Sequence, residues 1–192
     1  PEWFNSEAGK QSGRLKIEIP EAVAAYRAWV KKKYGSSTEP FIDIGVDPED
    51  GRGGSDDPLP PDEFAGINNW NHADKWWWLA NEVAKDYPEN DSHIVVSMYA
   101  YGDGATNALA PKFDLRKNVY PVIIPYAFQT AYLPAEMVKV WAGKIKGTMG
   151  IYDYWNITQW SLGLPQFNLH GMKDKLKFWR DNKINGIYIE TT

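Results

Sequence analysis

The chain has 192 residues, a formal net charge of −4 and no cysteine. This length is enough for one domain with a sizeable core, and the lack of cysteine excludes disulfides and thiolate metal sites. The acidic balance gives no basic surface for a nucleic acid, and no apolar run approaches the roughly 18 residues of a membrane helix, so we expect neither partner.

Aromatic residues make up 15% of the chain and include 10 Trp and 11 Tyr. These two side chains bury large faces but keep a polar group, so they suit both a protein core and a cleft in which sugars stack. We expect most of them in the core.

The N-terminal 16 residues are expected to be irregular, and the first helix is expected at residues 20–34. Pro20 suits a first helical turn, and the lysines at 31–33 suit the negative end of the helix dipole. Gly35 is expected to end the helix.

A buried strand is predicted at residues 41–46, and it runs directly into the carboxylates of Asp47, Glu49 and Asp50. In α/β folds, ligands gather at the C-terminal ends of parallel strands, which makes this end of the strand a candidate site. The long loop that follows is rich in Gly, Pro and Asp. Such a loop favours a functional role, because long loops without structure of their own are uncommon.

Strand and helix patterns then alternate to the end of the chain. Further helices are expected at 72–87, 134–145 and 171–182, and further strands at 93–101, 119–126, 148–154 and 186–192. Asn71 is a candidate N-cap. The helix that it caps carries Trp76, Trp77 and Trp78, which cannot share one face. We expect some of them to pack on the sheet and one to reach solvent or a neighbouring helix.

This alternation predicts parallel strands, either in an open doubly wound sheet or in part of a (β/α)8 barrel. Side-chain alternation favours the barrel: in the strand 41–46, Ile42 and Ile44 alternate with Asp43 and Gly45. An open sheet is expected to be aliphatic on both faces, whereas a barrel lumen fits a mixture of small, aromatic and polar residues. We therefore predict an α/β fold of the TIM-barrel type, with the whole chain as a single partial domain.

Five short motifs occur in order along the chain: PEWF (1–4), DPEDG (47–51), ANEVAKDYP (80–88), YDYW (152–155) and GIYIE (186–190). Together they resemble the family called domain of unknown function 4838, over nearly the whole chain. That family is similar to (β/α)8 glycoside hydrolases of the hexosaminidase-like and α-glucuronidase-like kinds. The resemblance implies that the five strands are barrel strands four to eight, and that the first three strands and the final helix lie outside this chain.

Glycoside hydrolysis normally uses two carboxyl groups, about 5–5.5 Å apart for retention of configuration and about 6.5–9.5 Å apart for inversion. Asp50 and Glu190 are the predicted catalytic pair, since strands four and eight of a barrel lie opposite one another and can face across a sugar. The alternatives are that Asp50 caps an Asp-Gly turn with Gly51, and that Glu190 pairs with a cation or hydroxyl of the lumen.

Other polar and aromatic side chains at strand ends are candidate sugar contacts. They are Asp47, Glu49, Tyr99, Tyr101, Tyr126, Tyr152, Asp153 and Trp155. Trp155 is expected to stack on a pyranose ring while Asp153 orients a sugar hydroxyl. Equally, the aromatic rings can fill the barrel mouth while Asp153 accepts hydrogen bonds from loop amides.

No metal or other cofactor is expected. The three histidines are scattered without the spacing of a zinc site. The acidic residues between 47 and 57 offer oxygen ligands to Ca²⁺ but lack the EF-hand pattern. No phosphate-binding glycine motif is present.

We therefore expect an extracellular or periplasmic glycoside hydrolase-like domain that acts on a polysaccharide or oligosaccharide by two-carboxylate acid/base chemistry. The alternatives are a carbohydrate-binding barrel domain without turnover and an open-sheet domain for an unrelated small ligand. Five of eight strands would leave two open edges, so we also expect a missing N-terminal barrel segment or another chain to close the fold.

Overall fold

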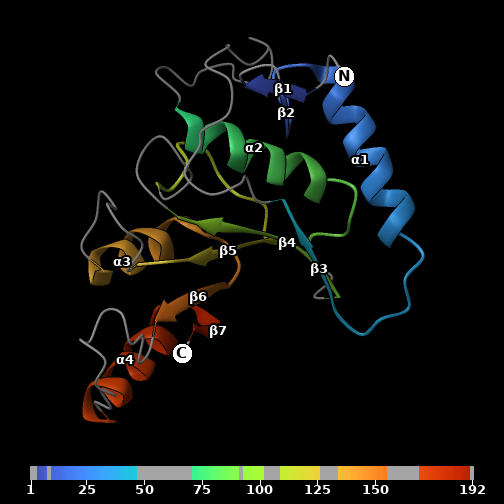
Figure 1. Ribbon diagram of the computed structural model, residues 1–192. Coiled ribbons are helices and arrows are strands. Elements are labelled where there is room, and N and C mark those ends of the chain that lie inside the picture. The colour runs from blue at the N-terminus through green and yellow to red at the C-terminus, as the bar shows by residue number, and fades with distance from the viewer. Residues whose placement is uncertain are drawn as a thin grey trace.

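The computed structural model describes residues 4–7, 10–46, 71–90, 93–101, 109–125, 134–154 and 169–190. At its centre is a five-stranded sheet of parallel neighbours in the order β3-β4-β5-β6-β7. Figure 1 shows that this sheet curls into a half-barrel, with the helices along its outer, convex side. The architecture is therefore α/β with parallel strands, as the sequence predicts.

The helices and strands predicted from residue 20 onwards are all present, and only their ends differ from the prediction. The strands of the sheet are β3 (Ile42–Gly45), β4 (Ile94–Ala100), β5 (Val119–Ile123), β6 (Met149–Tyr154) and β7 (Ile184–Glu190). The helices are α1 (Pro20–Tyr34), α2 (His72–Ala84), α3 (Pro134–Lys144) and α4 (Leu169–Asp181). None of these helices, within the residues described, is long and apolar enough to cross a membrane.

The strand order explains why the helices lie on one side of the sheet. A doubly wound sheet reverses its strand order, so its helices fall on both faces. Here each strand lies beside the preceding strand of the sheet, and right-handed crossovers then cover the same face each time. The concave face is consequently left without a helix among the described residues (Figure 1).

The expectation of an irregular N-terminus is wrong, because β1 (Phe4–Glu7) and β2 (Lys10–Leu15) pair as an antiparallel hairpin. These strands are polar and lack a clear apolar alternation, which is the pattern that identifies a half-buried strand. The two strands pair through their backbones, with Ser6 opposite Gln11 and Glu7 opposite Lys10. Apolar periodicity therefore could not detect them.

The convex side of the sheet forms the hydrophobic core. Ile44, Val96, Ile123 and Ile151 are each at most 2% exposed, and helix α2 lies against β4 above them. On β3 and β4 the aliphatic face that side-chain alternation assigns is thus the buried one, whereas Ile187 and Ile189 of the edge strand β7 are each 42% exposed. This leaves the mixed polar and aromatic faces of the same strands on the concave side.

Helix α2 begins with a capping box, which confirms Asn71 as its N-cap. The backbone N–H of Asp74 donates to Asn71 Oδ1, and the backbone N–H of Asn71 donates to Asp74 Oδ2, each at 2.9 Å. The side chain of Asp74 also accepts from the backbone N–H of Lys112 at 2.8 Å. One carboxylate therefore fixes both the start of the helix and the segment that leads into β5.

The three tryptophans of α2 are all buried, so none of them takes the first of the two expected places, solvent or a neighbouring helix. Trp77 instead meets Trp141 of α3, with ring centroids 4.8 Å apart, which is the neighbouring-helix alternative. Helix α1 packs on another side of α2, because Arg27 donates to Glu82 of α2 at 3.3 Å and to Asp86, just beyond the helix, at 2.9 and 3.0 Å. With neighbours on several sides, α2 has little surface left for solvent.

Candidate functional site

The concave face of the half-barrel carries the residues that sequence alternation places opposite the core. Its inward positions on β3–β7 are Asp43, Gly45, Val95, Ser97, Tyr99, Tyr120, Val122, Gly150, Tyr152, Tyr154, Gly186, Tyr188 and Glu190. These positions include five tyrosines and two carboxylates but no Lys, Arg or His. A face of this composition can stack on sugar rings and accept hydrogen bonds from hydroxyl groups.

Glu190 and Tyr152 meet at the C-terminal ends of β7 and β6. The Tyr152 phenol donates to Glu190 Oε2 at 2.7 Å. This hydrogen bond, together with partial burial and the nearby negative charge, raises the pKa of Tyr152 to about 12. Tyr152 therefore stays protonated at neutral pH and holds one oxygen of Glu190 in place.

Two further tyrosine rings contact Tyr152, the hydrogen-bond partner of this carboxylate. Tyr99 contacts Tyr152 edge-on with ring centroids 5.9 Å apart, and Tyr152 contacts Tyr154 with centroids 5.4 Å apart. Tyr99 keeps 37% of its surface exposed. The predicted sugar contacts Tyr99 and Tyr152 are thus brought together with the predicted catalytic Glu190, and we call Tyr99, Tyr152, Tyr154 and Glu190 the tyrosine cluster. The other described tyrosine of that prediction, Tyr101, follows β4 and is half-buried.

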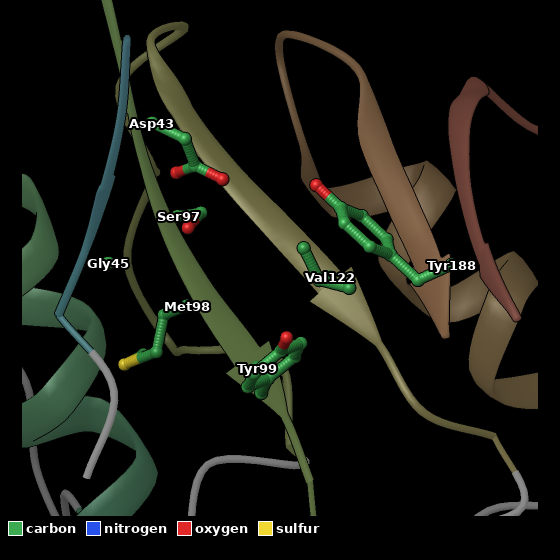
Figure 2. A pocket seen from close by; sticks show the side chains of 7 residues that line it. All are labelled: Asp43, Gly45, Ser97, Met98, Tyr99, Val122 and Tyr188. Atoms are coloured by element: carbon green, nitrogen blue, oxygen red, sulfur yellow. The ribbon is translucent and has the colours of Figure 1, made fainter. Parts of the chain in front are cut away.

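A pocket of about 240 Å³ opens on the same face, nearer to β3. Its lining residues are Asp43, Gly45, Ser97, Met98, Tyr99, Val122 and Tyr188. Figure 2 shows the Tyr188 ring running past Val122, with its hydroxyl on the side where Asp43 lies. Tyr99 lines both this pocket and the tyrosine cluster, so the two features share one wall.

Asp43 is the charged group of the pocket. Solvent reaches its side chain, but protein on several sides of the concave face removes part of its hydration. Burial therefore raises the pKa of Asp43, and the hydrogen bond with Ser97 lowers that pKa only in part. Burial and the negative charge of Asp43 in turn raise the pKa of Tyr188.

The sequence prediction missed Asp43 as a site residue. Its signal was present, since an aspartate between two buried isoleucines must point away from the core. The prediction instead chose carboxylates beyond the end of the strand, because chemistry in barrels gathers there.

Tyr120 forms the floor of the concave face near β7. Its hydroxyl donates to Asn185 Oδ1 at 2.8 Å, and its ring passes over Gly150 and Gly186. A Cβ at Gly186 would overlap the Tyr120 hydroxyl oxygen, so glycine is needed for this close approach. Burial, followed by the neighbouring Tyr188 and Asp43, raises the pKa of Tyr120 to about 12.

Asp153 lies apart from the tyrosine cluster. It alternates with Tyr152 along β6, is fully buried, and accepts a hydrogen bond from Lys175 Nζ of α4 at 3.0 Å. Its carboxylate therefore faces the helix layer and not the concave face. This contact matches neither the sugar hydroxyl nor the loop amides considered for Asp153.

Five of the predicted site residues lie outside the described residues: Asp47, Glu49, Asp50, Tyr126 and Trp155. The structure consequently describes one member of the predicted catalytic pair. Within the residues that it does describe, no group of three or more His, Asp or Glu side chains is placed to share a metal ion.

Comparison with models of known protein families and with curated proteins finds no match to this chain.

Proposed function

We propose that the chain is a glycoside hydrolase-like domain of the (β/α)8 type, with β3–β7 as barrel strands four to eight, that binds a polysaccharide or oligosaccharide on its concave face. The observation that carries this proposal is the tyrosine cluster. It presents an oriented carboxylate, Glu190, among partly exposed aromatic rings at the C-terminal ends of parallel strands. Chemistry in α/β barrels is built at this end of the strands.

The proposed reaction uses two carboxyl groups. One protonates the glycosidic oxygen as the bond to the leaving sugar breaks, and the other activates water or attacks the sugar carbon directly. Glu190 is one member of this pair and Asp50 is the other. Tyr152 is a positioning residue, since it fixes the orientation of the Glu190 carboxylate through the 2.7 Å hydrogen bond.

A carbohydrate-binding domain without turnover is the second candidate. The observation that favours it is the mutual contact of the Tyr99, Tyr152 and Tyr154 rings. Such a surface can stack on pyranose rings and gain affinity without any proton transfer.

The two candidates are separated by measuring glycan binding and glycan turnover with the same preparations. The variants are Glu190→Gln and Asp50→Asn, and the matched control is Asp174→Asn, which removes an exposed carboxylate from α4. Loss of one acid/base group is expected to lower kcat about 100-fold or more, with the control unchanged. Full turnover by both amide variants would refute the catalytic pair, and binding without turnover by the wild type would establish the second candidate.

Closure of the barrel is also part of this proposal. The edge strand β7 carries Ile187 and Ile189 on its convex side, each 42% exposed, and Leu176 of α4, the helix that contacts β7, is 41% exposed. Such apolar edges associate unless they are covered. We propose that an N-terminal barrel segment or another chain completes the barrel, and that the domain works on extracellular or periplasmic glycans.

A further inference from the structure

The pocket beside β3 shares Tyr99 with the tyrosine cluster but has a carboxylate of its own, Asp43. Its volume of about 240 Å³ lies below the roughly 300–1,000 Å³ of ordinary ligand pockets. It therefore suits one polar group of a ligand, and not a whole oligosaccharide. Asp43, Ser97 and Tyr188 converge on it from β3, β4 and β7 (Figure 2).

The charged side chains of the concave face indicate whether the polar group that binds in the pocket is a cation or an anion. Asp43 and Glu190 are the only charged side chains at the inward positions of the described strands, and both are acids. No Lys or Arg within the described part of the chain pairs with Asp43, and its hydrogen-bond partner there is the neutral Ser97. A carboxylate that has lost part of its hydration gains from a cation, whereas an anionic ligand is repelled.

The lining of the pocket also suits an ammonium group. An ammonium donates three hydrogen bonds, and the Asp43 carboxylate, the Ser97 hydroxyl and the Tyr188 hydroxyl can each accept one. The electron-rich faces of tyrosine rings attract cations as well, and Tyr99 and Tyr188 both line the pocket.

We propose that the pocket formed by Asp43, Ser97 and Tyr188 binds the protonated amino group of a sugar, so that the concave face takes a glycan with free amines. This inference rests on the proposed function, because it identifies the class of glycan. An α-glucuronidase-like site would have to hold an acidic sugar, which the described face disfavours.

The first test compares ligands and needs no variant. Glucosamine and galactosamine are titrated into the full chain, each beside its N-acetylated form and its neutral 2-hydroxyl counterpart, and binding is followed by NMR. The free amino sugars are expected to bind about tenfold more tightly than either counterpart, because a hydrogen bond to a charged group replaces a neutral one. Added salt should weaken this preference.

A panel of neutral polysaccharides tests the proposed function in parallel. If the panel is bound or cleaved but the free amines give no preference, the amine inference is wrong and the proposed function stands. If neither amino sugars nor any polysaccharide binds, both are wrong.

Variants of the pocket residues then test whether the preference for free amino sugars arises at this pocket. Asp43→Asn is expected to abolish the tenfold preference while affinity for the neutral counterparts stays within about twofold, and Asp174→Asn is expected to leave both unchanged. Tyr188→Phe, which keeps the ring and removes one acceptor, should reduce the preference in part. Retention of the full preference by folded Asp43→Asn, checked by circular dichroism, would overturn the assignment.

Discussion

The phenol of Tyr152 and the carboxylate of Glu190, 38 residues apart in sequence, are joined by a 2.7 Å hydrogen bond. The bond runs diagonally across the sheet, because the register places Tyr188 opposite Tyr152 and Tyr154 opposite Glu190. A diagonal contact of this kind is within reach of a long aromatic side chain. This bond connects the C-terminal end of β6 to the C-terminal end of the edge strand β7 and orients the Glu190 carboxylate towards the concave face.

The first prediction concerns this pair. Glu190→Gln removes the charge that holds the phenolic proton, so the pKa of Tyr152 should fall from about 12 towards its ordinary value of 10.0. The measurement is a spectroscopic pH titration of the tyrosines, with Tyr152→Phe used to identify the step that belongs to Tyr152. A Glu190→Gln titration that overlays the wild type would show that the hydrogen bond does not govern this phenol.

The same pair makes stability depend on alkaline pH. The folded-state pKa of Tyr152 lies above the ordinary value, so its contribution to the free energy of unfolding is fully present below pH 10 and is lost as pH rises to about 12. Glu190→Gln should reduce this loss. Denaturant titrations across that range measure it, with Tyr152→Phe as the variant that lacks the step altogether.

The second prediction concerns Asp43 and acidic pH. Burial raises the pKa of Asp43 above 3.8, so the folded state holds this proton more tightly than the unfolded chain. The contribution of the protonated Asp43 to the free energy of unfolding is therefore fully present below pH 3.8, and it is lost as pH rises through the raised pKa of Asp43. Asp43→Asn should remove that loss and make the protein more stable than the wild type at neutral pH.

Urea denaturation at a series of pH values measures the Asp43 effect. Asp174→Asn is the control, because it removes an exposed carboxylate of α4 and changes the net charge by the same amount. An Asp43→Asn profile parallel to that of the wild type would contradict the prediction.

The fold was largely predictable because the first strand of the sheet has one aliphatic face and one face of small or polar residues. Ile42 and Ile44 alternate with Asp43 and Gly45, and the structure buries the first pair and exposes the second. The start of β7 was not predictable, since Asn185 and Gly186 have the composition of a turn. A register shift and the hydrogen bond from Tyr120 to Asn185 hold this segment in the sheet, and both depend on residues far away in sequence.

The candidate site was predictable only in part. Glu190, Tyr99 and Tyr152 could be chosen because strand ends carry function. The partner of Asp153 could not be identified, since alternation turns it to the convex side and its lysine lies on α4, 22 residues later. Contacts between side chains of distant segments depend on packing, which local patterns do not encode.

The third prediction tests the close approach of Tyr120 to β7. Gly186→Ala places a methyl group against the Tyr120 hydroxyl, so it should destabilise the protein by about 1–3 kcal/mol. Tyr120→Phe removes the hydroxyl, and the next atom of the ring, Cζ, is 3.6 Å from the added Cβ. In the Tyr120→Phe background, Gly186→Ala should therefore be neutral or stabilising, since alanine restricts the unfolded chain more than glycine does.

A double-mutant cycle of thermal or urea unfolding measures this coupling. Tyr120→Phe alone should cost about 1 kcal/mol through the lost hydrogen bond to Asn185. Gly143→Ala, where an added Cβ meets nothing within 4 Å, is the matched control. Additive effects of Gly186→Ala and Tyr120→Phe would show that the two residues do not meet as described.

The fourth prediction separates a structural from a sugar-binding role for Asp153. Lys175→Met leaves the fully buried Asp153 carboxylate without the ammonium that lies 3.0 Å from it. Loss of one partner of a buried ion pair should cost about 3 kcal/mol, near the lower end of the usual range because Lys175 is partly exposed to water. The control is Lys177→Met on the same helix, an exposed lysine whose replacement should change stability by less than about 0.5 kcal/mol.

Glycan affinity of the same variants completes this test. Asp153 faces α4, so Asp153→Asn and Lys175→Met should lower the free energy of unfolding while the affinity for glycans per folded molecule stays unchanged. Urea unfolding and calorimetric titration of the same preparations give both quantities. A selective loss of affinity in Asp153→Asn at wild-type stability would instead place Asp153 in contact with the sugar, because a carboxylate that only supports the helix layer has no direct route to the ligand.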